Sequence, residues 1–412
     1  MRNNATNQQI TPMYSPWRML LWLLAAQIMV AFIGRSLGPL GVLIEDDLGL
    51  TKAQVGLLPS ALFLGQALAS IPSGFVVDRF GSKPLLLILS SCIGTSFLLM
   101  TFQTNFVLVL LLIMIGGIGY GGMHPTTNRG IVYWFTQKQR GTAMGIKQMG
   151  ITFGSALSAI LLLPLAETYG WRIVVLIACL GLMAAGALAF LFYRDPKVEE
   201  DKQRKKASPA STFSSLAAMA KNKPLLLISL SAMGINGSQM CLNTYLVLFT
   251  YEQIGINLVL AGLLLVVSEV GGSLGRIGWG VISDRMFGGE RLKVMMIIVI
   301  ITLCLSAVVA FIPAGTPYGL LVPLFFLFGF SVSGFNGIWM NLASELVPKE
   351  QAGLSSGFSI TLGSAGVILL PPLFGTIIDQ SNTYTFAWLM ISIIMTVVMI
   401  IISRLNKMTK AS

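Results

Sequence analysis

Charged side chains are scarce in this sequence of 412 residues. They make up 10% of it, whereas they make up about 25% of an ordinary soluble domain. Hydrophobic residues supply 55% of the chain, and the mean hydropathy is +0.80. A soluble domain does not combine so many apolar side chains with so few charges, so the composition predicts an integral membrane protein.

Residues that bind metals or form disulfides are also few. The chain has one histidine and four cysteines. The cysteines all lie inside apolar runs without the spacing of metal ligands: Cys92, Cys179, Cys241 and Cys304. We therefore expect them to be small packing residues, and we expect neither a metal site nor a cofactor. The sequence shows no set of nucleophile, base and oxyanion donors and no phosphate-binding loop, so an enzyme is not expected.

Long apolar runs fill most of the chain. The first begins near Trp17, and it is too long for a cleavable signal and lacks a small-residue cleavage site. A polar, basic segment at 194–223 reads as a linker between two sets of runs. With about 20 residues for each span, the pattern predicts twelve membrane helices, near residues 17–43, 52–78, 83–102, 105–134, 140–166, 171–193, 224–252, 257–284, 291–313, 317–345, 351–378 and 382–405.

The basic residues are distributed unevenly between the two sides of these spans. The net charge is +11, yet of the 27 lysines and arginines only Lys52 and Arg172 fall in the loops of one side. Basic loops stay in the cytoplasm, so the pattern predicts a multi-pass protein of the cell membrane with both termini cytoplasmic. The linker is expected to lie beside anionic membrane lipids. Topology explains the charge, and a nucleic-acid partner is not expected.

A charged turn follows the second apolar run and is repeated half a chain later. The first copy is Gly74-Phe75-Val76-Val77-Asp78-Arg79-Phe80-Gly81-Ser82-Lys83, and the second begins Gly280-Val281-Ile282-Ser283-Asp284-Arg285. Carboxylates and guanidinium groups are too costly to leave in hydrocarbon, so each copy marks the end of a span. The pattern G-x-x-x-D-R-x-G-x-K/R between the second and third helices resembles the signature of the major facilitator superfamily.

The resemblance implies an all-α membrane protein with two pseudo-symmetric six-helix bundles and a substrate site between them at the mid-plane. The bundles would be residues 1–193 and 224–412, with the cytoplasmic linker at 194–223. The similar segments 140–145 and 352–357 fit the same repeat. We expect a monomer that works by alternating access, in which the charges of the two turns act in gating: Asp78, Arg79, Asp284 and Arg285.

Six ionisable side chains lie inside the predicted spans: Arg35, His124, Arg129, Lys147, Glu269 and Arg276. A charged side chain costs roughly 2.5–3.5 kcal/mol at the centre of a membrane helix, so such residues are functional candidates. Three arginines and a lysine face a single carboxylate. That excess of positive charge predicts an anionic substrate, with a small carboxylate as the first choice.

Arg35 lies in Gly34-Arg35-Ser36-Leu37-Gly38-Pro39, where glycines and a proline loosen the helix. Its guanidinium can hold a carboxylate through two hydrogen bonds, and snorkelling to the membrane surface is the alternative. The run resembles the first helix of the anion:cation symporter family, and Gly117–Pro125 followed by Trp134-Phe135 resembles the fourth. An acidic residue of the family is replaced by Gly34.

Tyr120 stands where that family places its proton-coupling glutamate, and Ile113 replaces an arginine of the family. The resemblance therefore implies the architecture, with Tyr120 in the substrate site, but it does not imply the family's proton coupling. His124 lies one turn beyond Tyr120 and titrates near neutral pH. It is expected either to take part in coupling or to be a hydrogen-bonded packing residue before Pro125.

Lys147 and Gln148 lie in the fifth predicted span. A lysine offers positive charge and an amide offers both donor and acceptor groups, so both are candidates for substrate contact. Snorkelling of Lys147 to the inner surface is the alternative. Arg129 lies nearer the cytoplasmic end, within reach of the turn that contains Asp78, and is expected to form a gating ion pair there.

Glu269 and Arg276 are seven residues apart, about two turns along one helix face. Arg276-Ile277-Gly278-Trp279-Gly280 resembles the R-x-x-x-G of monocarboxylate carriers, which implies that Arg276 holds a carboxylate. Glu269 is the only carboxylate near the centre of a predicted span, so it is the first candidate for the proton-binding group. A static ion pair is the alternative. Asn336 is a further candidate for lining the site.

Together these features predict proton-coupled uptake of a small organic anion, with sodium as the other coupling ion considered. An exporter working by proton antiport is the alternative function. Such exporters resemble one another in G-x-x-x-G-P-x-x-G-G on the fifth helix, and Gly150-Ile151-Thr152-Phe153-Gly154-Ser155 lacks the proline. A sensor on the same scaffold would be expected to carry an added soluble domain.

Overall fold

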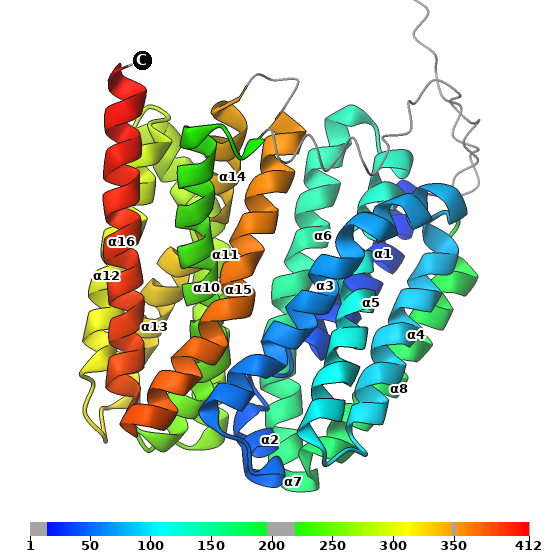
Figure 1. The fold of residues 1–412 in the computed structure, drawn as a ribbon. Coiled ribbons are helices and arrows are strands. Elements are labelled where there is room, and N and C mark those ends of the chain that lie inside the picture. Colours follow the sequence, from blue (N-terminus) through cyan, green and yellow to red (C-terminus); the bar gives the residue numbers. More distant parts are fainter. Residues whose placement is uncertain (1–14, 196–218, 348–351, 412) are drawn as a thin grey trace, which may run out of the picture.

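The computed structural model describes residues 15–195, 219–347 and 352–411, and its regular secondary structure is helical (Figure 1). Twelve helices in these ranges are long and apolar enough to cross a membrane, which confirms the predicted fold class. A helix satisfies its own backbone hydrogen bonds, which hydrocarbon requires of a spanning segment. The predicted linker at 194–223 lies mostly outside the described residues.

The first half of the chain contains α1 (Pro16–Gly34), α2 (Gly41–Leu48), α3 (Lys52–Phe80), α4 (Ser82–Met100), α5 (Phe106–Trp134), α6 (Gln137–Leu157), a π-helical turn (Ser158–Leu162), α7 (Leu163–Tyr169) and α8 (Trp171–Phe192). The second half contains α10 (Lys223–Glu252), α11 (Leu258–Met286), α12 (Arg291–Ala310), α13 (Tyr318–Val332), α14 (Asn336–Glu345), α15 (Ala352–Ser381) and α16 (Tyr384–Ala411). We call the end where α1 begins and α16 ends the terminal end, and the opposite end the α2 end (Figure 1).

Three of the predicted spans are interrupted in the structure. The first was predicted to continue to residue 43, but α1 ends at Gly34 and the chain bends before α2. At the bend, a Cβ atom on Gly38 would lie 2.5 Å from the backbone oxygen of Asn243, so the close approach of α10 requires a glycine. The fifth span contains the π-helical turn 158–162, and the tenth is divided into α13 and α14.

A close crossing of two glycines occurs in both halves. A Cβ on Gly117 of α5 would lie 3.1 Å from the Cα of Gly65 on α3. In the second half, a Cβ on Gly334, beside α14, would lie 2.8 Å from the Cα of Gly275 on α11. Small residues let membrane helices pack backbone against backbone. The second and fourth helices of each half therefore cross in the same way, as the internal repeat predicts.

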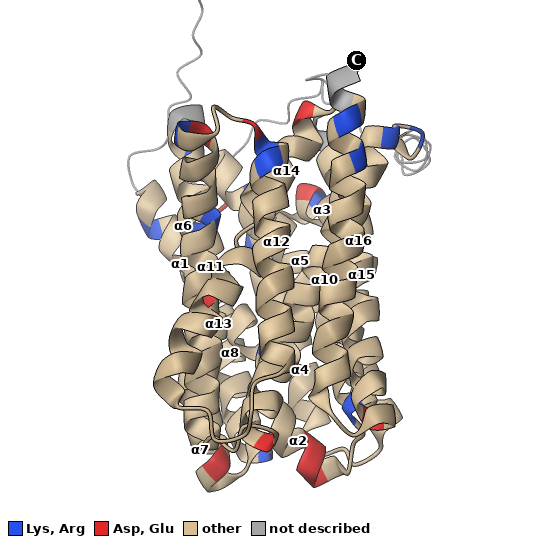
Figure 2. Cartoon of the chain, turned by 90° about the vertical axis from the view of Figure 1, so that its left-hand side faces the viewer, with Lys and Arg blue, Asp and Glu red and all other residues tan. Residues whose placement is uncertain are grey.

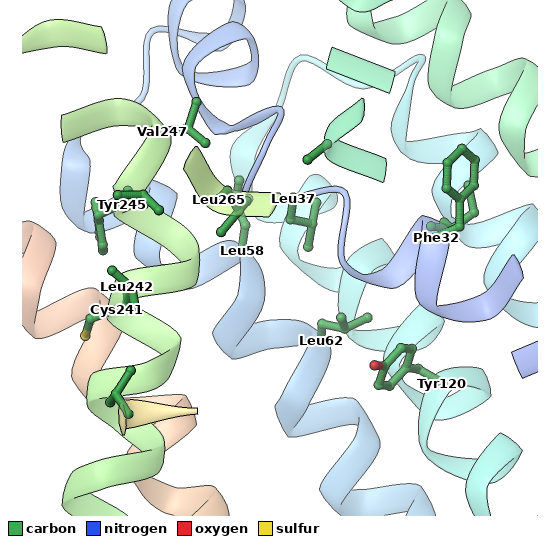
Figure 3. Close-up of a cluster of buried hydrophobic side chains, with 14 of the residues drawn as sticks. Phe32, Leu37, Leu58, Leu62, Tyr120, Cys241, Leu242, Tyr245, Val247 and Leu265 are labelled. Carbon is green, nitrogen blue, oxygen red and sulfur yellow. The ribbon is translucent and has the colours of Figure 1, made fainter. Parts of the chain in front are cut away.

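Most charged residues lie toward the two ends, and few lie in the middle (Figure 2). The α2 end carries six carboxylates, Glu45, Asp46, Asp47, Glu167, Glu252 and Asp379, with Lys52 and Arg172. Buried apolar side chains from both halves fill the interior, and Figure 3 shows Leu58, Leu62 and Tyr120 of the first half with Leu242 and Leu265 of the second. This pattern fits a chain that crosses a membrane many times.

The two halves are joined most closely at the α2 end. Helix α3 packs against α15 there, and the two diverge toward the terminal end (Figure 1). The backbone N–H groups of Lys52 and Ala53 both donate to Asp379 at 2.8 Å. Nearer the middle, the Ser60 hydroxyl donates to the backbone oxygen of Ile368 at 2.7 Å. These contacts close the α2 end in this conformation.

Candidate functional site

A recess at mid-height lies between the two halves. Its walls come from the bend after α1, from α3 and α6, and from α10 and α11 of the second half: Gly34, Arg35, Leu37, Gly38, Pro39, Pro59, Ser155, Met240, Asn243, Leu265 and Glu269. The structure therefore brings Arg35 and Glu269 together in one recess, although they belong to different halves of the chain.

Arg35 is positioned by neutral and aromatic groups. It follows the last residue of α1, and its Nε donates to the Tyr120 hydroxyl at 3.3 Å. The guanidinium lies over the Phe63 ring, 5.2 Å from the ring centre, which is a favourable cation–π distance. The side chain is thus held in place while its positive charge remains available to an anion.

Gly34 and Tyr120, the two departures from the resembled family, lie against each other. A Cβ on Gly34 would stand 2.6 Å from two carbons of the Tyr120 ring, closer than any real contact. Tyr120 is buried and also packs edge-on against Phe63. The missing side chain at position 34 is therefore what makes room for the tyrosine that orients Arg35.

Glu269 connects the two halves at the recess. It is 7% exposed, and its Oε1 accepts a hydrogen bond from the Ser155 hydroxyl of α6 at 3.1 Å and one from Asn243 Nδ2 of α10 at 3.2 Å. Asn243 and Ser155 are site residues that the sequence analysis did not select. Asn243 could have been predicted, because the polar pair Asn243-Thr244 lies inside the otherwise apolar α10.

Arg276 and Asn336 meet at a different point. Arg276 Nε donates to the backbone oxygen of Ser333 at 3.4 Å, and Asn336 Nδ2 donates to the same oxygen at 3.2 Å. This carbonyl belongs to the interruption between α13 and α14. Neither side chain lines the recess that contains Arg35. Arg276 is nevertheless close enough to Glu269 and Arg35 for its charge to interact with theirs.

Lys147 is buried on α6, with 2% of its surface exposed. Its Nζ donates to Asn128 Oδ1 on α5 at 2.9 Å, a neutral partner. Gln148 is the next residue along the helix and is exposed, because adjacent residues on a helix do not share a face. The His124 ring lies 6.1 Å from the Tyr120 ring, edge to face. His124 therefore adjoins the Arg35 site through Tyr120.

The charged turn at the terminal end is organised within one half. Arg129 Nη1 lies 3.4 Å from Asp195 Oδ1, and Arg129 Nε lies 3.9 Å from Asp78 Oδ1. Asp195 also accepts hydrogen bonds from the first two N–H groups of α4, at 3.1 and 2.9 Å. Arg79, Asp284 and Arg285 are exposed. These contacts tie the end of α8 to α4 and α5 and do not cross to the second half.

We expect Asp195→Ala to destabilise the protein more than Asp78→Ala does. Asp195 caps the start of α4, and losing such a cap costs about 0.5–2 kcal/mol, whereas an exposed ion pair contributes about 0–1 kcal/mol. The side chain of Asp78 is 68% exposed. The apparent melting temperature of purified protein in detergent measures the difference. A larger fall for Asp78→Ala would show that Asp78 makes the stronger contact.

The chain matches one protein-family model and is similar to several transporters. The family model described as "Major Facilitator Superfamily" matches residues 23–371. The chain is 25% identical over 363 residues to "Hexuronate transporter" of Bacillus subtilis, covering 84% of each chain. It is 26% identical over 386 residues to "Probable sulfoacetate transporter SauU" of Cupriavidus necator, covering 89% of this chain and 88% of that protein. The crystal structure of the nucleoside transporter NupG superposes with a TM-score of 0.76 at 17% identity, covering 94% of this chain and 99% of that one.

Proposed function

This chain belongs to the Major Facilitator Superfamily, and we propose that it carries a small organic anion across the cell membrane by proton-coupled uptake. The observation that carries the proposal is the charge of the buried groups at mid-height. Glu269 is the one carboxylate near the centre of a described span. Lys147 and Arg276 also lie in described spans, and Arg35 follows the last residue of the first span. An anion that enters the site would balance this excess of positive charge.

The geometry of Arg35 favours an oxyanion with a planar or forked pair of oxygens. Its guanidinium is held by Tyr120 and Phe63, and a held guanidinium forms two parallel hydrogen bonds to a carboxylate or a similar acid. The relatives at 25–26% identity have names that refer to a hexuronate and to sulfoacetate. Both are acids that are ionised at neutral pH, and this supports the anionic class without selecting one compound.

We place the terminal end in the cytoplasm, because the cations of the chain outnumber its carboxylates and only Lys52 and Arg172 lie at the α2 end. Since the α2 end is closed in this conformation, the site would exchange substrate with the cytoplasm through the terminal end. Rocking of the halves about the recess would open the α2 end and expose the same site to the outside. Asp78, Arg129 and the second copy, Asp284 with Arg285, are proposed to act in gating at the cytoplasmic end.

Glu269 is the proposed proton-binding group of the transport cycle. Its carboxylate contacts Ser155 of the opposite half. A change in its charge would therefore alter a contact at the interface between the halves, which must rearrange during alternating access. Protonation would weaken the attraction between Glu269 and a nearby cation and would leave that cation to the substrate. Lys147 and Arg276 are proposed to hold the anion on its way between Arg35 and the cytoplasm.

Counterflow in proteoliposomes tests the proposal. Vesicles loaded with one unlabelled organic acid should accumulate the same labelled acid from outside, without any ion gradient. A panel of sugar acids, sulfonates, simple carboxylates and cationic dyes separates the anion carrier from the exporter. We expect counterflow with at least one acid and none with the dyes. Counterflow of a cationic dye without any acid would contradict an anion carrier.

A further inference from the structure

Lys52 is the central residue of the contact that closes the α2 end. Its Nζ lies 2.5 Å from Glu45 Oε1 on α2 and 2.6 Å from Glu252 Oε1 on α10. Its backbone N–H donates to Asp379 on α15 at 2.8 Å, and its backbone oxygen accepts from the Tyr245 hydroxyl on α10 at 2.7 Å. One residue of the first half is thus held by two helices of the second.

Glu45 is the least satisfied carboxylate of this contact. One of its oxygens is paired with Lys52, and the other, Oε2, is buried and has no hydrogen-bond partner. Its side chain is 14% exposed. An ionised carboxylate is costly when one oxygen has lost its water and gained no donor in exchange. The position therefore favours a carboxyl group that carries a proton while the α2 end is closed.

The surrounding charges do not remove this cost. Besides Lys52, the ionisable groups that face Glu45 are its neighbour Asp46, then Glu252 and Tyr245 of α10, Asp379 of α15 and Tyr384 of α16. The Tyr384 hydroxyl donates to Glu252 Oε2 at 2.7 Å, and the Tyr245 hydroxyl donates to backbone oxygens. Lys52 is thus the one cation in this group, and it is shared with Glu252.

Burial raises the pKa of Glu45 to about 7, against a smaller lowering by Lys52. Glu45 lies on the short helix α2, beyond the spanning part of α1. If the halves part at this end, Glu45 gains water and its pKa falls toward the ordinary value for glutamate, about 4.3. Between these two values the closed form binds a proton that the open form does not hold.

We propose that Glu45 is a proton-binding site that takes up a proton when the α2 end closes and releases it when the α2 end opens. The inference rests on the proposed function, because it assumes that this end opens during alternating access. The proton on Glu45 is taken up from the solution on the α2 side and is released to the same side. It is therefore distinct from the transported proton, which we assign to Glu269. Glu45 sets how readily the α2 end opens at a given outside pH.

The sign of the effect follows from linkage. The closed form has the higher pKa at Glu45, so it binds more protons, and closure is favoured below about pH 7 and weakens as the pH rises through that value. A single cysteine at Ser60 reports opening, because Ser60 lies on α3 and is buried against α15. In a variant without the four native cysteines, Ser60→Cys would be labelled by a membrane-impermeant maleimide.

We expect the labelling rate of Ser60→Cys, divided by the rate for the unfolded protein at the same pH, to rise about 30-fold between pH 5.5 and pH 8, as linkage gives for a pKa of about 7 in the closed form and about 4.3 in the open form. Glu45→Gln should remove most of this rise, and Glu45→Asp should keep it. Asp46→Asn is the matched control: it removes a neighbouring charge that is exposed, and the rise should remain. A rise that persists in Glu45→Gln, or is lost equally in Asp46→Asn, would overturn the proposal.

The labelling measurement is independent of the substrate. If counterflow fails for every organic acid but labelling follows Glu45, the proposed substrate class is wrong and the proton site stands. If counterflow succeeds but the normalised labelling rate is the same at pH 5.5 and pH 8, the proposed function stands and the proton site at Glu45 is wrong.

Discussion

Arg35→Lys is expected to reduce the apparent affinity for the organic anion by about 10- to 100-fold, the range that follows from losing one charged hydrogen bond of about 1.5–3 kcal/mol. Lysine keeps the positive charge, but it lacks the planar fork that binds two oxygens and stacks on Phe63. The concentration dependence of uptake into proteoliposomes measures the change. The melting temperature in detergent should stay close to that of the unsubstituted protein.

Arg172→Lys is the matched control for this prediction. Arg172 also has a carboxylate partner, Asp47 at 2.7 Å, and it lies over the Trp171 ring, but it is at the α2 end and outside the recess. The same substitution there should leave the affinity within about two-fold. Equal losses in both variants, or full activity of Arg35→Lys, would argue against a bidentate grip by Arg35.

Glu269→Gln is expected to keep substrate exchange and to lose accumulation driven by a pH gradient. Glutamine resembles protonated glutamate, and its amide oxygen can still accept from Ser155 and Asn243. A transporter that exchanges substrate never has to release its proton, so the exchange rate should stay within a few-fold. Accumulation requires deprotonation in each cycle and should fall to the level set by passive equilibration.

Two further variants make this second result specific. Glu167→Gln changes an exposed carboxylate at the α2 end and should leave both activities intact. His124→Gln changes the other titratable residue near the site. If Glu269→Gln still concentrates the anion when a proton gradient is the only driving force, Glu269 does not carry the coupled proton. His124 would then be the next residue to test.

The spans were predictable from the sequence because a membrane helix depends on the length and composition of one continuous segment. About 20 apolar residues are needed for each crossing, and the charges that end a crossing, such as Asp78 and Arg79, are visible in the sequence. The break after Gly34 was not predictable in this way. The glycines and the proline at 34–39 indicated a loosened helix, but the end of the helix there depends on the approach of Gly38 to the backbone of Asn243, far along the chain in the other half.

The sequence predicted which charged residues belong to the candidate site, but it predicted less well which of them lie together. The cost of burying a charge selected Arg35 and Glu269, and these do meet at the recess. The same rule does not select uncharged partners, so Ser155 and Asn243 were missed. It also selected Arg276, which the structure places beside Asn336 at the Ser333 carbonyl, outside the lining of the recess but within electrostatic reach of Glu269 and Arg35. Which charged side chains share a site depends on how each helix is rotated about its own axis. The sequence of a glycine-rich helix does not determine that rotation.

The contact between Gly34 and Tyr120 constrains how such a site can change over time. A tyrosine that arose at position 120 while position 34 still had a side chain would overlap its Cβ, because the two would lie 2.6 Å apart. A glycine at position 34 creates only a small void and is tolerated beside a smaller residue at position 120. Any side chain introduced at position 34 would therefore have to displace the Tyr120 ring, so the two positions are coupled and changes at them are expected not to be independent.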